Sequence, residues 1–320
     1  MDTDIHIVFI HQGESWYLPY VLHQAKSNNQ DRTVILLGGE SDLEGIHREI
    51  LAELESHRAQ EFLRLYRHRS SNGESFEVFC WLRWFYLLEY MEKARVDSVW
   101  YLDSDVMLYS TIADIHQNYP IGASDCGYLI LQQDFASFDW AAAAHVSYWT
   151  RSALKQFCDF VTRSFQDEEY LKLYERKWQF HVNQGVPGGI CDMTTLYLFW
   201  REFPELVTNL AQSRHNTVFD LGIKTSDGYE RNEYVARSGM KTIKFLNKAP
   251  MLCRTHSHDL VRAHALHFQG EGKNYIPSFY RGEKFRGKRR ADIFHACQLA
   301  NQVGKRSLKR FRNFAYSKFR

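Results

Sequence analysis

The chain has 320 residues, of which 44% are hydrophobic and 24% charged, an ordinary globular composition with enough material for one large or two modest domains. No apolar run approaches the roughly 18 residues of a membrane span, and the amino terminus lacks a basic region followed by an apolar one, so we expect neither a transmembrane protein nor one with a signal peptide. The formal net charge is only +2, and the six cysteines are far apart without a Cys-x-x-Cys pair, which argues against a metal cluster or a disulfide framework and favours reduced thiols in the cytoplasm.

The first part of the chain alternates predicted strands and helices. Residues 5–10 and 33–37 are short apolar runs typical of buried strands, and a helical stretch between them contains residues 21–25. Residues 41–44 have the Ser-x-x-Glu pattern of a capping box, and apolar residues then recur at helical spacing up to residue 54, which predicts a second helix. This alternation predicts an α/β fold in which a mainly parallel sheet is covered by helices on both faces.

A buried helix is predicted over residues 76–91, which are apolar on nearly every face. Arg83 lies in its middle. Because a buried guanidinium must be paired, its partner is either a structural carboxylate or a phosphate or sugar hydroxyl in a crevice at the end of the next strand.

That next strand ends in two carboxylates. The apolar residues 99–102 are followed by Asp103, Ser104 and Asp105, and side chains alternate across a strand, so the two carboxylates can face one way and the serine the other. Ligands of open α/β sheets bind beyond the carboxyl ends of strands. Paired carboxylates suit Mg²⁺ or Mn²⁺, although a short Asp-x-Asp can equally be a solvated turn.

The middle of the chain contains further predicted strands, at residues 127–131 and 145–149, with a helix over residues 154–165 behind them. A polar and aromatic segment leads into a glycine-containing loop at residues 183–189, which starts with Asn183 and Gln184 and can bring its backbone close to a ligand. Asp192 then heads a helix up to residue 203, either as its N-cap or as a carboxylate that faces a bound sugar.

A second candidate segment lies near the end, at residues 264–273. His267 ends a short strand, and Gly270 and Gly272 separate it from Lys273, so a turn can return the lysine toward a ligand of the histidine. An imidazole on a metal and an ammonium on its phosphates would complete the coordination that the acidic pair begins. Zinc bound by the neighbouring histidines is the alternative, but their spacing lacks a matching Cys or Glu set.

These two motifs together resemble a known signature. Tyr-Leu-Asp-x-Asp at residues 101–105, with His-x-x-Gly-x-x-Lys at residues 267–273, is similar to the metal and diphosphate signature of GT-A glycosyltransferases, especially the retaining glycosyltransferase family 8. The resemblance covers most of residues 4–275 and implies a GT-A (Rossmann-like) fold. Two departures are Asn274 and Tyr275, which replace the Pro-Trp that often follows the lysine, and a weaker match at Gln184 and Asp192 to the acidic acceptor loop.

The resemblance also implies roles for individual residues. Asp103, Asp105 and His267 would bind Mn²⁺ or Mg²⁺, and Lys273 with Gly270 would bind the diphosphate. Donor contacts would come from Arg83 and Asp103, acceptor contacts from Gln184, and nucleoside contacts from the loop Ile10, His11, Gln12 and Gly13.

The implied function is metal-dependent transfer of a sugar from a nucleotide-sugar, with UDP as the preferred nucleotide, to a glycan or lipid-linked acceptor. If configuration is retained, the departing phosphate can take the proton of the acceptor; if it is inverted, a carboxylate base is needed, and Asp192 is the candidate. A nucleotidyltransferase would normally carry a basic glycine-rich loop after the first strand, which residues 11–14 lack. A non-catalytic sugar-binding relative is the third alternative, against which the intact ligand set argues.

The last part of the chain is a separate electrostatic unit. Residues 281–320 carry 13 Lys and Arg against two acidic residues, a net charge of +11, which leaves −9 on residues 1–280. We therefore expect a catalytic domain at 1–280 and a basic helical extension at 281–320. Residues 304–320 form a basic amphipathic pattern that either docks on the domain or contacts an anionic membrane peripherally, and the acidic remainder offers no groove for nucleic acid.

Overall fold

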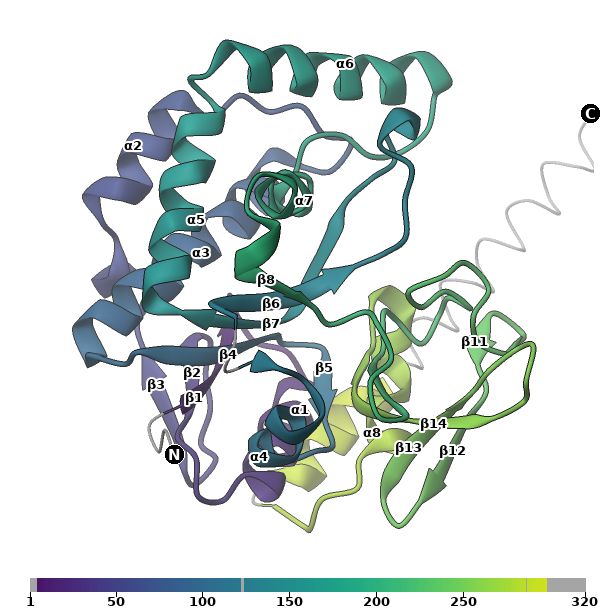
Figure 1. The fold of residues 1–320 in the computed structure, drawn as a ribbon. Coiled ribbons are helices and arrows are strands. Elements are labelled where there is room, and N and C mark those ends of the chain that lie inside the picture. Colours follow the sequence, from purple (N-terminus) through teal and green to yellow (C-terminus); the bar gives the residue numbers. More distant parts are fainter. Residues whose placement is uncertain (1–4, 122–123, 286, 298–320) are drawn as a thin grey trace, which may run out of the picture.

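A seven-stranded sheet forms the centre of the protein in the computed structural model, which describes residues 5–121, 124–285 and 287–297 (Figure 1). The strand order is β3-β2-β1-β4-β7-β6-β8, and all neighbours are parallel except β4 with β7 and β7 with β6. The predicted mixed, mainly parallel α/β sheet is confirmed. The strands are β1 (Ile5–His11), β2 (Val34–Gly38), β3 (Ile46–Glu49), β4 (Ser98–Asp103), β6 (Cys126–Ile130), β7 (Ala142–Thr150) and β8 (Val207–Asn209).

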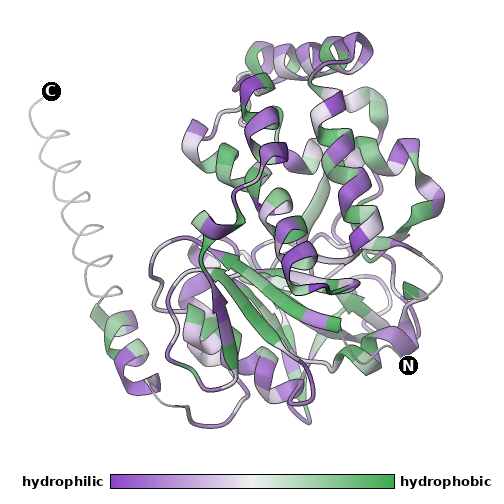
Figure 2. Cartoon of the chain, turned by 90° about the vertical axis from the view of Figure 1, so that its left-hand side faces the viewer, coloured by the Kyte–Doolittle hydropathy of each residue, from purple (hydrophilic) through white to green (hydrophobic). Residues whose placement is uncertain are grey.

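Helices cover both faces of this sheet. Alternation of side chains along each strand creates two apolar cores: Val99 and Tyr101 of β4 face one core, and Trp100 and Leu102 face the other. The first core is closed by α2 (His57–Leu65), α3 (Glu74–Ala94), α5 (Arg151–Ser164), α6 (Glu168–Gln184) and α7 (Asp192–Glu202). The second is closed by α1 (Leu18–Asn28), α4 (Ile112–Asn118) and a second sheet. In Figure 2 the strands of the sheet are mostly hydrophobic, whereas the helices carry hydrophilic residues along part of their surface.

The second sheet joins residues that are far apart in the sequence. Its path is β12-β13-β14-β5, with β9 parallel to β14. Strand β5 (Val106–Leu108) follows β4 almost directly and pairs antiparallel with β14, so that His267 lies opposite Val106. The corner between the two sheets is therefore Ser104 and Asp105. The other strands are β9 (Thr217–Phe219), β12 (Ile243–Leu246), β13 (Ala249–Cys253) and β14 (Leu260–His267), and a separate hairpin joins β10 (Ala236–Arg237) and β11 (Met240–Lys241).

Two local predictions are wrong. Residues 41–54 form no α-helix, because residues 46–49 take the edge of the sheet and pair with β2, and only a 3₁₀ turn, η1 (Leu51–Leu54), follows. The segment 168–184 is one helix, α6, which ends at Gly185 in the left-handed conformation. The loop predicted to begin at Asn183 therefore begins at Gly185, and Gln184 belongs to the last turn of a helix.

The remaining short helices are η3 (Phe135–Ser137), η4 (Pro204–Leu206), η5 (Gly270–Tyr275) and α8 (Ile276–Phe279). Beyond them, Phe285 packs on His23 of α1, and the Trp16 ring stacks on His295 at 4.3 Å. The domain boundary at residue 280 stays a prediction, and the amphipathic segment 304–320 lies outside the described residues. Within the part of the chain that the structure describes, no helix is long and apolar enough to cross a membrane.

We predict that the stability of the sheet depends on the aromatic core between α3, α5 and β7. Phe157 of α5 is fully buried and packs against Trp84 and Trp149. Phe157→Ala should lower the free energy of unfolding by about 3–5 kcal/mol, measured by urea denaturation. Lys155→Ala is the control: this exposed residue of the same helix makes one surface ion pair with Asp159, so its loss should cost at most about 1 kcal/mol. Equal losses in the two variants would contradict the assignment of this core.

Candidate functional site

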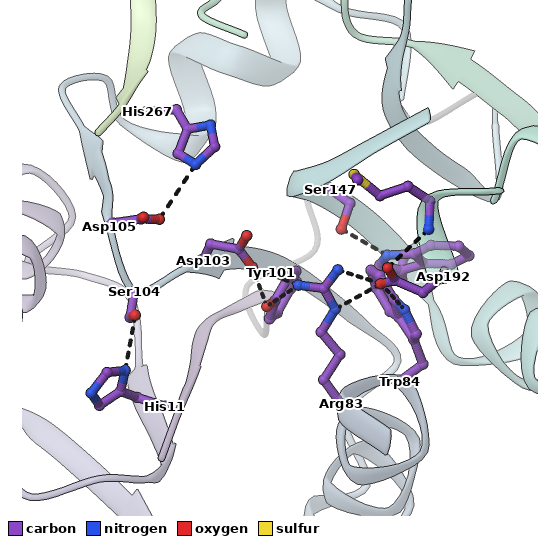
Figure 3. A network of polar contacts seen from close by, with 12 residues as sticks. His11, Arg83, Trp84, Tyr101, Asp103, Ser104, Asp105, Ser147, Asp192 and His267 are labelled. Atoms are coloured by element: carbon purple, nitrogen blue, oxygen red, sulfur yellow. Dashed lines mark hydrogen bonds and ion pairs between the residues drawn. The ribbon is translucent and has the colours of Figure 1, made fainter. Parts of the chain in front are cut away.

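The candidate site lies where β1 and β4 end. The two strands are parallel neighbours, with Ile10 opposite Asp103, so their carboxyl ends meet at one edge of the sheet. His11 Nδ1 lies 2.9 Å from Ser104 Oγ, which ties the two ends together (Figure 3). The end of strand β2 also lies close to His11. Gly38 has φ +83°, and a Cβ at this position would lie 2.2 Å from the His11 carbonyl oxygen. Only glycine fits there.

Asp103, Asp105 and His267 converge at this edge. One potential ligand atom from each of the three lies within 4.8 Å of the others, an arrangement that can hold a metal ion. Asp103 is the last residue of β4, Asp105 lies in the corner that follows, and His267 is placed beside them by the pairing of β14 with β5 (Figure 3). Two carboxylates and one imidazole suit Mn²⁺ or Mg²⁺, which complete their coordination with water and ligand oxygens.

The hydrogen bonds of the His267 ring define which of its nitrogens can bind a metal ion. Nδ1 lies 3.0 Å from the Leu221 carbonyl oxygen, which can only accept, so Nδ1 carries the proton. Nε2 points at Asp105 Oδ1, 3.5 Å away. Burial alone would lower the pKa of His267, but Asp105, Asp103 and the Leu221 carbonyl together outweigh burial and raise that pKa. The site therefore favours a positive charge between Nε2 and Asp105, and a divalent cation meets this requirement.

Lys273 supplies a further positive charge. Its Nζ lies 2.7 Å from Asp105 Oδ2, and the lysine side chain is about one-third exposed. Burial would raise the pKa of Asp105, but the interactions with His267 and Lys273 outweigh it and hold that pKa below its ordinary value. Asp105 is thus ionised at neutral pH, and the partly exposed ammonium has further N–H donors for an anion beside the acidic pair.

On the other side of Asp103, Arg83 binds two carboxylates. Its Nε lies 3.0 Å from Asp192 Oδ2, and one terminal nitrogen lies 2.9 Å from Asp103 Oδ1. The Asp192 oxygen also accepts from the indole N–H of Trp84 at 2.9 Å, and the Tyr101 hydroxyl donates to Asp103 Oδ1 (Figure 3). The partner of the buried arginine is therefore a pair of carboxylates, the structural option considered from the sequence.

Asp192 does not cap its helix. Cys191 occupies the N-cap position of α7, and Asp192 is the first helical residue, with its side chain only 3% exposed. Its carboxylate links α7 to α3 through Arg83.

The other predicted site residues occupy different positions. Ile10 is buried in β1, and Gln12 and Gly13 are exposed just beyond it. Gly270 has φ +57° and starts η5, which carries Lys273. Gln184 is exposed at the end of α6, and none of its described contacts reaches Asp103, Asp105 or His267.

Several residues of the site were missed from the sequence. Tyr101 lies two residues before Asp103 on the same face of β4, so alternation could have identified it. His145 stacks on the His267 ring at 4.0 Å, and Asp220 accepts a hydrogen bond from the backbone N–H of His267. Asp220 follows β9, whose pairing with β14 no local pattern reveals, and His145 lies in β7 of the central sheet, far from His267 in the sequence.

No family model and no curated protein matches the sequence. Among solved structures, the chain is similar to apo mouse xyloside xylosyltransferase 1, with 12% identity, a TM-score of 0.45, and 65% of this chain and 85% of the other covered. A galactosyltransferase, LgtC, in complex with donor and acceptor sugar analogues, gives 18% identity, a TM-score of 0.37, and 58% and 72% coverage. The apo WbbM bifunctional glycosyltransferase gives 9% identity, a TM-score of 0.49, and 92% and 52% coverage.

All three are glycosyltransferases. The structures that this chain resembles are thus of the class that the sequence motifs predict, while membership of family 8 stays a prediction. All three TM-scores lie below 0.5, so the likeness itself says nothing about donor, acceptor or mechanism.

We predict that Arg83 stabilises the fold by neutralising the buried carboxylate of Asp192. Arg83→Met leaves the Asp192 carboxylate buried without its cation, which should lower the free energy of unfolding by about 3–5 kcal/mol in urea denaturation. The double variant Arg83→Met/Asp192→Leu removes both charges and should regain most of that loss. A single variant as stable as the parent would contradict this role of the pair.

Proposed function

We propose that the protein is a metal-dependent glycosyltransferase that moves a sugar from a nucleotide-sugar, with UDP as the nucleotide, to a glycan or glycolipid acceptor. The observation that carries the proposal is the convergence of Asp103, Asp105 and His267 with Lys273 at the carboxyl ends of β1 and β4. Such an edge is where α/β sheets bind their ligands, and this one offers a cation site next to an ammonium.

The chemistry follows from the leaving group. When the bond between sugar and phosphate breaks, negative charge grows on the nucleoside diphosphate, and Mn²⁺ held by Asp103, Asp105 and His267 would act as a Lewis acid that stabilises it. Lys273 donates to the same diphosphate oxygens from beside Asp105. The loop from Ile10 to Gly13 lies next to Ser104 and receives the nucleoside.

Arg83 orients the metal site from behind. The Arg83 guanidinium and the Tyr101 hydroxyl both donate a hydrogen bond to Oδ1 of Asp103. Among the described residues, both of these hydrogen bonds go to Oδ1 and none to Oδ2, so Oδ2 is the oxygen that would serve as a metal ligand. Arg83 would thus fix which carboxylate oxygen binds the metal.

The surroundings of Asp192 favour retention of configuration. A general base must reach the proton of the acceptor hydroxyl within hydrogen-bond distance. The Asp192 carboxylate is buried, and its Oδ2 accepts N–H groups from Arg83 and Trp84. In a retaining reaction no such base is required, because the departing phosphate can take the proton, and Asp192 then contributes by holding Arg83.

A test of the metal assignment is Asp105→Asn, which keeps the shape of the side chain and removes its charge. Titration calorimetry should give tight UDP binding by the parent with Mn²⁺ and a loss of at least about tenfold in the variant. Lys155→Ala, distant on α5, should bind as the parent does. Binding of UDP that does not depend on Mn²⁺ in the parent would contradict the proposed cofactor.

A test of the diphosphate assignment compares two ligands. Lys273→Met should weaken UDP binding by about 10- to 100-fold, the value of a lost charge-assisted hydrogen bond. Binding of uridine, which carries no phosphate, should not change. Equal affinity of parent and variant for UDP would make Lys273 an ordinary surface charge that pairs with Asp105.

A further inference from the structure

Behind His267, on the side away from Asp105, lies a buried charged group that the proposed reaction does not use directly. Asp220 and Lys241 form an ion pair with 2.6 Å between Oδ1 and Nζ, and both side chains are fully buried. Lys241 also donates to the carbonyl oxygen of Asp227 at 2.7 Å. Burial of two charges is costly in general and often no more stabilising than an apolar pair, so its presence here calls for another explanation.

The polar groups of Asp220 other than Oδ1 contact residues around His267. Its second carboxylate oxygen accepts from the His267 backbone N–H at 3.3 Å, and its own N–H donates to the carbonyl of Ala265 at 3.3 Å. Its carbonyl oxygen lies 2.9 Å from Nε2 of His145. The next residue, Leu221, provides the carbonyl that fixes the proton on Nδ1 of His267. Asp220 therefore positions the backbone that selects the tautomer of His267.

His145 restricts the same ring from the side. It is buried in β7, and its ring lies nearly parallel to that of His267, at 18° and 4.0 Å between centroids. Because Nε2 of His145 faces a carbonyl oxygen, it donates, and the Asp220 backbone holds this ring as well. The His267 ring thus has its plane set by His145 and its protonated nitrogen set by Leu221.

We propose that Asp220, Lys241 and His145 are positioning residues that hold the Nε2 lone pair of His267 toward Asp103 and Asp105, where it serves as a metal ligand. The inference rests on the proposed function, since it assumes a cation at those three residues. Partners of this kind around a ligating histidine typically change metal affinity by about 10- to 100-fold when removed. A purely structural group would change stability and leave metal affinity alone.

The first experiment measures Mn²⁺ affinity by electron paramagnetic resonance of free Mn²⁺, with the full chain and without substrate. His145→Ala should weaken binding by about tenfold. His145→Phe, which keeps a flat ring against His267, should restore affinity close to that of the parent. His181→Ala is the control. It removes another buried histidine, which lies on α6 and contacts Gly188 and Phe180, and it should bind Mn²⁺ as the parent does.

The second experiment removes the ion pair from both sides at once, with Asp220→Asn/Lys241→Met, so that no buried charge is left unpaired. Mn²⁺ affinity should again fall by about tenfold. If this variant does not fold, the His145 pair decides alone.

The outcomes separate the two hypotheses. A parent that binds no Mn²⁺ would overturn the proposed metal site itself. A parent that binds Mn²⁺, with His145→Ala equal to it, would overturn only the positioning role.

Discussion

Neutralisation of negative charge at one edge of the sheet is the constraint on which the site depends. Asp103, Asp105 and Asp192 lie close together and are largely shielded from solvent, so each needs a positively charged partner. Arg83 lies between Asp192 and Asp103, and Lys273 and His267 both face Asp105. The guanidinium side is closed by hydrophobic packing around Trp84, whereas the lysine side is partly exposed. This difference divides the edge into a rigid half that supports the site and an open half that can exchange its partners for a cation and an anionic ligand.

The sequence was most informative where the chemistry of a residue conflicts with its surroundings. The helix around Arg83 is apolar, and Asp103 and Asp105 end an apolar strand. Burial of such charges is costly unless they are paired, and Arg83 indeed contacts Asp103 in the structure. The continuous apolar runs of β1 and β4 indicated the parallel sheet, because strands of such sheets are buried on both faces. His267 and Lys273 were located by their type and spacing, since the turn between them is local.

Features that depend on distant partners could not be predicted. Apolar residues between 43 and 54 have helical spacing, but the backbone hydrogen bonds of residues 46–49 to β2 outweigh this short amphipathic pattern. Segment 168–184 was missed as a helix because its polar residues cover most of its surface, and only Lys177 and His181 with Tyr174 are buried. The pair of Asp220 with Lys241 has no signal in the sequence. Both residues resemble ordinary surface charges there, and only the folded chain brings their segments together, with the Lys241 N–H bonded to the Ile223 carbonyl oxygen. Local patterns thus located the ligands, and only tertiary pairing revealed what supports them.

The antiparallel pairing of β5 with β14 has a consequence for biosynthesis. The two aspartates at the end of β4 emerge from the ribosome long before His267, because about half of the chain lies between them and this histidine. All seven strands of the central sheet precede His267 in the sequence, yet this histidine reaches its place only with the second sheet. A nascent chain therefore cannot bring His267 beside Asp103 and Asp105 until β14 has paired with β5, so this cluster is completed late in synthesis.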